Sequence, residues 1–163
     1  MTFRDDSGAT RHANRRRVLL AGAAAVGGLA AVAGCTGGGG DDDRDPQQQV
    51  DDYLSNDDTY DGNIEDHTDE SSPTVAVGAE GNGNNFAYAP SAIRVATGTT
   101  VTWEWTGLGS SHNVVHENGA FDSQLVAEEG HTYQYTFESE GVFRYYCSPH
   151  RTAGMKGAVV VEG

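Results

Sequence analysis

Residues 147–155, Cys147-Ser148-Pro149-His150-Arg151-Thr152-Ala153-Gly154-Met155, place three metal-binding side chains in one short stretch. The spacing Cys-x2-His-x4-Met supplies a thiolate, an imidazole and a thioether. A trigonal His₂Cys set with a weak, long axial Met is typical of blue copper sites. The stretch therefore predicts a type 1 site for one copper ion, and a second histidine must come from elsewhere in the chain.

The best candidate for that second imidazole is His112, which follows the Gly107–Ser111 loop at the start of a strand. His116 lies four residues further on, about 13 Å away in a strand at ~3.3 Å per residue, so one ion cannot bind both. We expect His116 to lie on the surface and His131 at an exposed strand edge. His67 lies in an acidic segment, where we expect it to be solvated.

Each predicted ligand has a chemical reason. Cys147 would bind as a thiolate, whose soft sulfur stabilises both oxidation states of copper, and Met155 would be the axial thioether. Zinc also accepts His₂Cys, but structural zinc sites recruit further thiolates or histidines and do not use Met. Groups around a metal site usually orient its ligands. We expect Asn113 and Pro149, each adjacent to a predicted ligand, to do so here.

From Pro73 onward the sequence consists of short alternating stretches separated by turn residues. Thr100–Thr106 places Val101, Trp103 and Trp105 on one face, and Val142–Cys147 likewise alternates. Alternation with period two indicates strands with one buried face. The predicted strands are Thr74–Ala79, Phe86–Tyr88, Ala92–Val95, Thr100–Thr106, His112–His116, Thr132–Phe137, Val142–Cys147 and Lys156–Glu162. Short strands in this number predict an all-β Greek-key sandwich.

The N-terminal part divides into two predicted segments. Residues 1–35 indicate a twin-arginine signal peptide, because Arg15-Arg16-Arg17 precedes an apolar run that is too short to span a bilayer. The run ends in Val32-Ala33-Gly34-Cys35, which resembles a lipobox, so Cys35 is the predicted lipidation site. The composition of residues 36–72 predicts an acidic, Gly/Asp-rich flexible tether. Within it, Val50, Tyr53 and Leu54 have the spacing of one helical turn that could dock on the domain of residues 73–163.

Charge excludes one class of partner. The formal net charge is −14, with 24 Asp and Glu against 10 Lys and Arg, so no basic surface is available for nucleic acid. Such acidity fits a halophilic source, because molar salt screens repulsion between surface carboxylates, although an acidic mesophile remains the alternative. The chain has two cysteines, Cys35 and Cys147. We expect no disulfide between them, since each has a separate predicted role.

The stretch Tyr145–Gly157 and the upstream Ser111-His112-Asn113-Val114-Val115 resemble the plastocyanin-type cupredoxins. With the leader, the lipobox and the acidic tether, the likeness is greatest to the halocyanin branch, the membrane-attached blue copper proteins of haloarchaea. The resemblance implies His112, Cys147, His150 and Met155 as ligands. It also implies His150 as the ligand nearest the surface, where electrons leave, and an apolar rim from which Arg151 departs.

The resemblance implies a one-electron carrier in a respiratory-type chain, lipid-anchored at the extracytoplasmic face of the cell membrane. Its partners would be membrane protein complexes rather than a small-molecule substrate. A copper enzyme would need further His-x-His or His-Cys-His ligands, which this sequence lacks, and a dinuclear copper site would need a second loop cysteine where Arg151 stands. Copper storage or delivery is the alternative function, although the chain has two Met in all. A metal-free adhesion sandwich would leave the Cys147–Met155 loop unexplained.

Overall fold

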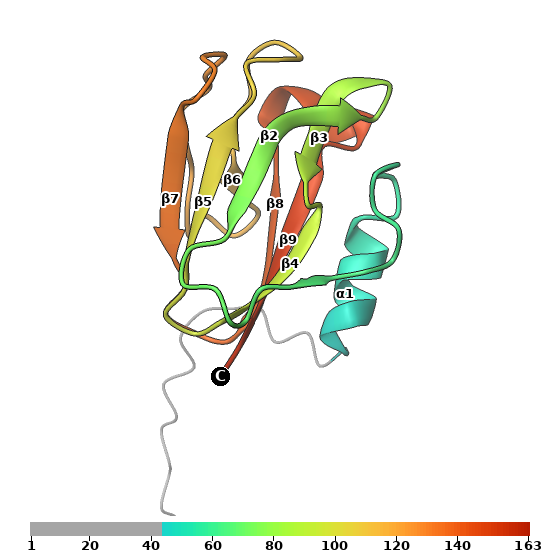
Figure 1. Ribbon diagram of the computed structural model, residues 1–163. Coiled ribbons are helices and arrows are strands. Elements are labelled where there is room, and N and C mark those ends of the chain that lie inside the picture. Colours follow the sequence, from blue (N-terminus) through green and yellow to red (C-terminus); the bar gives the residue numbers. More distant parts are fainter. Residues whose placement is uncertain (1–43) are drawn as a thin grey trace, which may run out of the picture. The chain divides into compact units, whose positions relative to one another are not determined.

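The computed structural model describes residues 44–163, which fold as two β-sheets with one helix on the outside (Figure 1). The predicted signal peptide, Cys35 and the first part of the predicted tether lie outside the described residues. The elements are α1 (Pro46–Tyr53), β1 (Glu65–Asp66), β2 (Thr74–Gly81), β3 (Asn84–Ala89), β4 (Ala92–Ala96), β5 (Thr100–Trp105), β6 (Val115–His116), β7 (Thr132–Thr136), β8 (Gly141–Tyr146), the 3₁₀ helix η1 (Ser148–Ala153) and β9 (Lys156–Glu162).

The sheets have the strand orders β1-β4-β9-β8-β6 and β3-β2-β5-β7. Both sheets are mixed, with parallel pairs (β2 with β5, β4 with β9) beside antiparallel pairs (β8 with β9, β5 with β7). Neighbours in space are therefore often far apart in sequence. The predicted all-β sandwich is confirmed, and its strand boundaries agree with the sequence to within a few residues, apart from the shorter β6.

The core between the sheets follows the alternation that the sequence showed. Val101, Trp103 and Trp105 of β5 point inward and are buried, as are Tyr145 of β8 and Cys147 directly after it. Burying an aromatic or aliphatic side chain contributes on the order of 1.5–3 kcal/mol. The strand that leads to the predicted copper loop is therefore anchored in the best-packed part of the domain.

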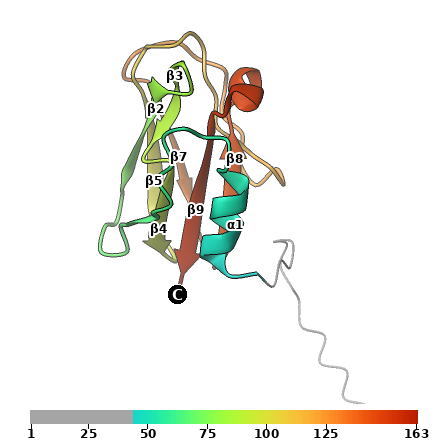
Figure 2. The same cartoon turned by 90° about the vertical axis from the view of Figure 1, so that its right-hand side faces the viewer.

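Strand β9 is buried on both of its faces, because α1 covers the outer one (Figure 2). Val159 and Val161 face the core between the sheets, whereas Ala158 and Val160 pack with Val50 and Leu54. The predicted helical turn is present, as the longer helix α1. Asp45 caps its start by accepting a hydrogen bond from the Gln47 backbone N–H, and a Pro stands in its first turn, where a missing N–H costs nothing.

Residues 44–72 contain more regular structure than the predicted flexible tether. Besides α1, strand β1 pairs in parallel with β4, and His67 N–H donates to the Arg94 carbonyl. This pairing could not be expected from the sequence, because Glu65 and Asp66 show no apolar pattern and pair through their backbone. Within residues 44–163, no helix has the length and apolar character needed to cross a bilayer.

Two histidines lie in surroundings other than those expected. His67 is half-buried between Glu65 and Glu70 rather than solvated. His116 is buried, not on the surface, and its ring stacks on Phe121 at 5.0 Å. The Ala120 backbone N–H donates to His116 Nδ1, so this ring closes a turn and faces the core, and does not face the copper loop.

Candidate metal centre

The four predicted ligands come from two segments of the chain that the fold brings together. His112 lies in the segment after β5 and pairs through its backbone with Val126. Cys147 follows β8, His150 lies in η1, and Met155 directly precedes β9. The pairing of β8 with β9 therefore closes the Cys147–Met155 loop, and the other sheet delivers His112 to it.

The three nitrogen and sulfur donors form a compact triangle. The edges are 3.7 Å from Cys147 Sγ to His112 Nδ1, 3.4 Å from Cys147 Sγ to His150 Nδ1, and 3.1 Å between the two Nδ1 atoms. A circle through these three atoms has a radius of about 2.0 Å, close to the ~2.0–2.3 Å of metal bonds to imidazole nitrogen and thiolate sulfur. Their spacing thus fits one metal ion in a trigonal plane.

Hydrogen bonds fix the orientation of the His112 ring. Its Nε2 lies 2.9 Å from the Leu108 carbonyl and donates to it, which leaves the Nδ1 lone pair for a metal. The His112 carbonyl in turn accepts from the indole N–H of Trp105 at 3.1 Å. Metal-binding histidines usually have their second nitrogen held in this way. These two hydrogen bonds therefore orient the His112 ring so that Nδ1 is available to bind a metal.

Burial sets the protonation states of the donors. It lowers the pKa of the imidazoles of His112 and His150, so both rings are neutral near neutral pH and can bind a metal. Burial raises the pKa of the Cys147 thiol, and the backbone N–H groups of Asn113 and His150 oppose that rise. A metal must therefore displace the thiol proton, and these N–H groups would then stabilise the resulting thiolate.

Met155 is completely buried in the core cluster that also contains Cys147. Its carbonyl accepts from Cys147 N–H at 3.1 Å, and its own N–H donates to the His150 carbonyl at 3.2 Å. The loop thus closes on itself through backbone hydrogen bonds. The buried Met155 thioether lies in the same loop as Cys147 and His150, and it would be the fourth residue to hold a copper ion.

The two supporting residues from the sequence occupy the expected positions. Asn113 Oδ1 accepts from Ser148 N–H at 2.8 Å, and its Nδ2 donates to Ser148 Oγ at 3.2 Å. This amide joins the two ligand-bearing segments. Pro149 stands in the first turn of η1, where its ring restricts the backbone that leads to His150.

Phe86 also contacts the site, which its position in the sequence did not indicate. Its ring stacks on the His150 imidazole, with centroids 4.0 Å apart and planes at 14°, and lies edge-on to His112. Phe86 is in β3, far from both histidines in sequence. The packing of β3 against the ligand loop brings the two rings together, and no local sequence pattern indicates that packing.

Residues 74–162 match the copper-binding proteins of the plastocyanin/azurin family. The halocyanin of Natronomonas pharaonis is 51% identical over 119 residues, which cover 70% of this chain and 72% of that protein. The chain belongs to the plastocyanin/azurin family of copper-binding proteins. Copper is accordingly the cofactor that His112, Cys147, His150 and Met155 are positioned to hold.

More distant relatives match a shorter part of the chain. The plastocyanin of Scenedesmus fuscus is 32% identical over 99 residues, covering 55% of this chain and 98% of that protein. Among solved structures, a mutant plastocyanin of a fern is 26% identical and covers 55% of this chain and 99% of that chain, with a TM-score of 0.47. The family match begins at residue 74, so α1 and β1 lie outside it.

Asn113→Ala tests the link between the ligand-bearing segments. We expect a loss of about 1–3 kcal/mol in the free energy of unfolding, because both hydrogen bonds to Ser148 disappear. We also expect faster release of copper to a chelator. Urea unfolding and chelator kinetics would measure the two effects, with the exposed Asn118→Ala as control. Equal effects in the two variants would show that the Asn113 amide is not a support of the loop.

Proposed function

We propose that the protein is a one-electron carrier, tethered to the extracytoplasmic face of the cell membrane, that serves a respiratory-type electron transfer chain. The observation that carries the proposal is the triangle of His112, Cys147 and His150 beside the buried Met155. When bound, copper supplies a Cu(II)/Cu(I) couple. The protein holds the donors in fixed positions through the packing and hydrogen bonds described above. Little rearrangement is then needed between oxidation states, which favours electron transfer.

The surface around the site supports a protein as the redox partner. Of the three nitrogen and sulfur donors, His150 is the least buried. Leu108 and Leu125 are the exposed large hydrophobic residues of the described chain, at 55% and 56% exposure. The Leu108 carbonyl accepts from His112, and Leu125 precedes Val126, which pairs with the His112 backbone. These two exposed leucines lie near His112, whose ring centroid is 4.8 Å from that of His150, and an apolar surface there suits a transient protein partner.

Membrane attachment is supported by the sequence of the first 35 residues. The paired arginines before an apolar run favour export, and the small residues before Cys35 favour lipidation of that cysteine. One acyl chain anchors a protein only marginally, so stable attachment would require at least two. The net charge of −14 supports function at high salt.

The full-length protein loaded with Cu(II) tests the proposed chemistry. We expect an intense blue colour that bleaches on reduction and returns on oxidation, with copper retained over repeated cycles. If the protein instead transfers Cu(I) to a chelator or to a metal-free acceptor protein on each reduction, it is a copper delivery protein. Mass spectrometry of the native N-terminus would test the anchor, and an unmodified Cys35 would exclude it.

Leu125→Asp tests the docking surface. We expect electron exchange with the membrane fraction of the source cells to slow by about tenfold, because a charge would be desolvated in the interface. The absorption spectrum should not change, since Leu125 donates nothing to the metal. Ser139→Asp adds the same charge between β7 and β8, at the opposite end of β8 from Cys147, and is the matched control. Equal rates in both variants would place the docking surface elsewhere.

A further inference from the structure

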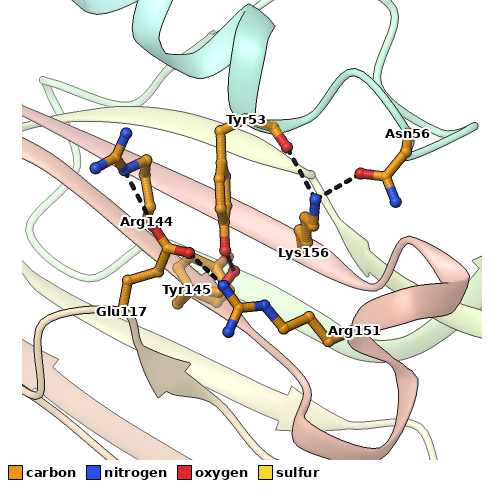
Figure 3. A network of polar contacts seen from close by, with 7 residues as sticks. All are labelled: Tyr53, Asn56, Glu117, Arg144, Tyr145, Arg151 and Lys156. Carbon is orange, nitrogen blue, oxygen red and sulfur yellow. Dashed lines mark hydrogen bonds and ion pairs between the residues drawn. The ribbon is translucent and has the colours of Figure 1, made fainter.

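The segment Tyr53–Asp58, which we call the brace, contacts the copper loop from outside the shared family domain. Tyr53 Oη donates to the Tyr145 carbonyl at 2.9 Å, two residues before Cys147. Lys156, directly after Met155, donates through Nζ to the Tyr53 carbonyl at 3.3 Å and to Asn56 Oδ1 at 2.6 Å (Figure 3). The brace therefore holds the chain on both sides of the ligand loop.

Gly154 shows how closely the brace approaches the loop. A Cβ at this position would lie 2.5 Å from the Asn56 carbonyl oxygen and 2.6 Å from Asn82 Oδ1. Its φ of +108° also belongs to the region that glycine favours, and this residue ends η1. The loop turns from His150 to Met155 at a point where only a glycine fits against the brace.

A second set of contacts joins the brace to the ring that supports His150. Asn82 Oδ1 accepts from Asp58 N–H at 3.0 Å, and Asn82 N–H donates to Asp58 Oδ1 at 2.6 Å. Asn82 Nδ2 donates both to Asp57 Oδ1 at 3.0 Å and to the Phe86 carbonyl at 2.8 Å. Since the Phe86 ring stacks on His150, this network also reaches the least buried of the three donors.

The brace is itself firmly attached. Val50 and Leu54 on either side of Tyr53 are buried against Ala158 and Val160 of β9. The Tyr53 ring lies between Arg144 and Lys156, with cation-to-centroid distances of 5.7 Å and 5.1 Å (Figure 3). Attraction between these cations and the aromatic ring holds the ring in place. The brace can thus transmit the rigidity of the sandwich to the loop.

We propose that Tyr53 and Asn56 are positioning residues of the copper centre, and that the brace limits opening of the ligand loop and so slows release of copper. The chain before residue 73 then has a structural task in addition to that of a tether. The proposal rests on the copper site and goes beyond the proposed electron transfer. Its test does not require the protein to transfer electrons.

Tyr53→Phe and Asn56→Ala in the full-length protein test the proposal. Each change removes one brace contact and leaves the four ligands and the family domain untouched. In the metal-free protein, amide hydrogen exchange of residues 147–155 should become about fivefold faster in each variant, which is the effect of one hydrogen bond. Cu(I) release from the loaded protein to an excess of chelator should accelerate by a similar factor, and more in the double variant.

Asp52→Asn is the matched control, because Asp52 lies on the same helix and its exposed ion pair with Arg44 is remote from the loop. Exchange in β5 is the internal reference and should stay unchanged in all variants. Two results would overturn the proposal. Unchanged exchange and release would show that the loop does not depend on the brace. Equal acceleration in β5 and in the loop would show that the brace contributes only to global stability.

Discussion

Cys147→Ser is expected to abolish the blue colour of the Cu(II)-loaded protein. The intense absorption of a type 1 site comes from charge transfer between thiolate and copper, and Cys147 supplies the one thiolate of the donor triangle. A serine hydroxyl is not deprotonated near neutral pH and is a hard, poor ligand for Cu(I). Absorption spectroscopy and titration with a Cu(I) chelator should show loss of colour and a large loss of affinity.

Two controls make this result specific. Cys35→Ser removes the other cysteine of the chain and should leave the colour intact. His116→Ala should also remain blue, because that ring stacks on Phe121 and bonds to the Ala120 backbone, although the variant should lose stability. Colour that persists in Cys147→Ser, or disappears in His116→Ala, would contradict the assigned ligand set.

The ligand loop could be recognised from the sequence because its chemistry is local. Cys147, His150 and Met155 lie within nine residues, and a tight loop between paired strands keeps such neighbours together in space. His112 required an argument from topology, namely that it leaves a loop at a strand start. The alternation in Thr100–Trp105 identified the buried face of β5 equally well, because a strand has the same period wherever it lies.

The parts that the sequence did not reveal depend on distant pairings. Phe86 reaches His150 only through the packing of β3 on the copper loop, and Glu65–Asp66 join β4 only through backbone bonds. His116 looked like a surface residue beside Glu117 and an Asn-Gly turn, yet its ring points into the aromatic cluster. A two-residue strand gives no alternation from which its inward face could be identified.

Trp103→Ala is expected to have the largest effect on stability. Trp103 in β5 is 0% exposed and packs against four aromatic rings. One of them is Tyr145, 5.4 Å away between ring centroids, in the strand that leads to Cys147. Replacing a buried Trp with Ala typically costs about 3–5 kcal/mol, because the cavity collapses only in part. Against a typical total of about 5–15 kcal/mol, this loss is a large fraction of the stability, so the metal-free variant should unfold at a much lower urea concentration. Urea unfolding of the metal-free protein would measure this loss.

Copper should rescue this variant, because the folded state alone brings the four ligands together. A ligand present at about a thousand times its dissociation constant stabilises the folded state by ~4 kcal/mol, which is similar to the expected loss. The loaded variant should therefore stay folded and blue, since Trp103 provides no ligand. Leu125→Ala removes an apolar side chain that is 56% exposed and should change the unfolding free energy by no more than about 0.5 kcal/mol. If copper failed to raise the stability of Trp103→Ala, the core beneath Tyr145 and the ligand loop would have to unfold separately. The continuous packing from β5 through β8 to Cys147 argues that they unfold together.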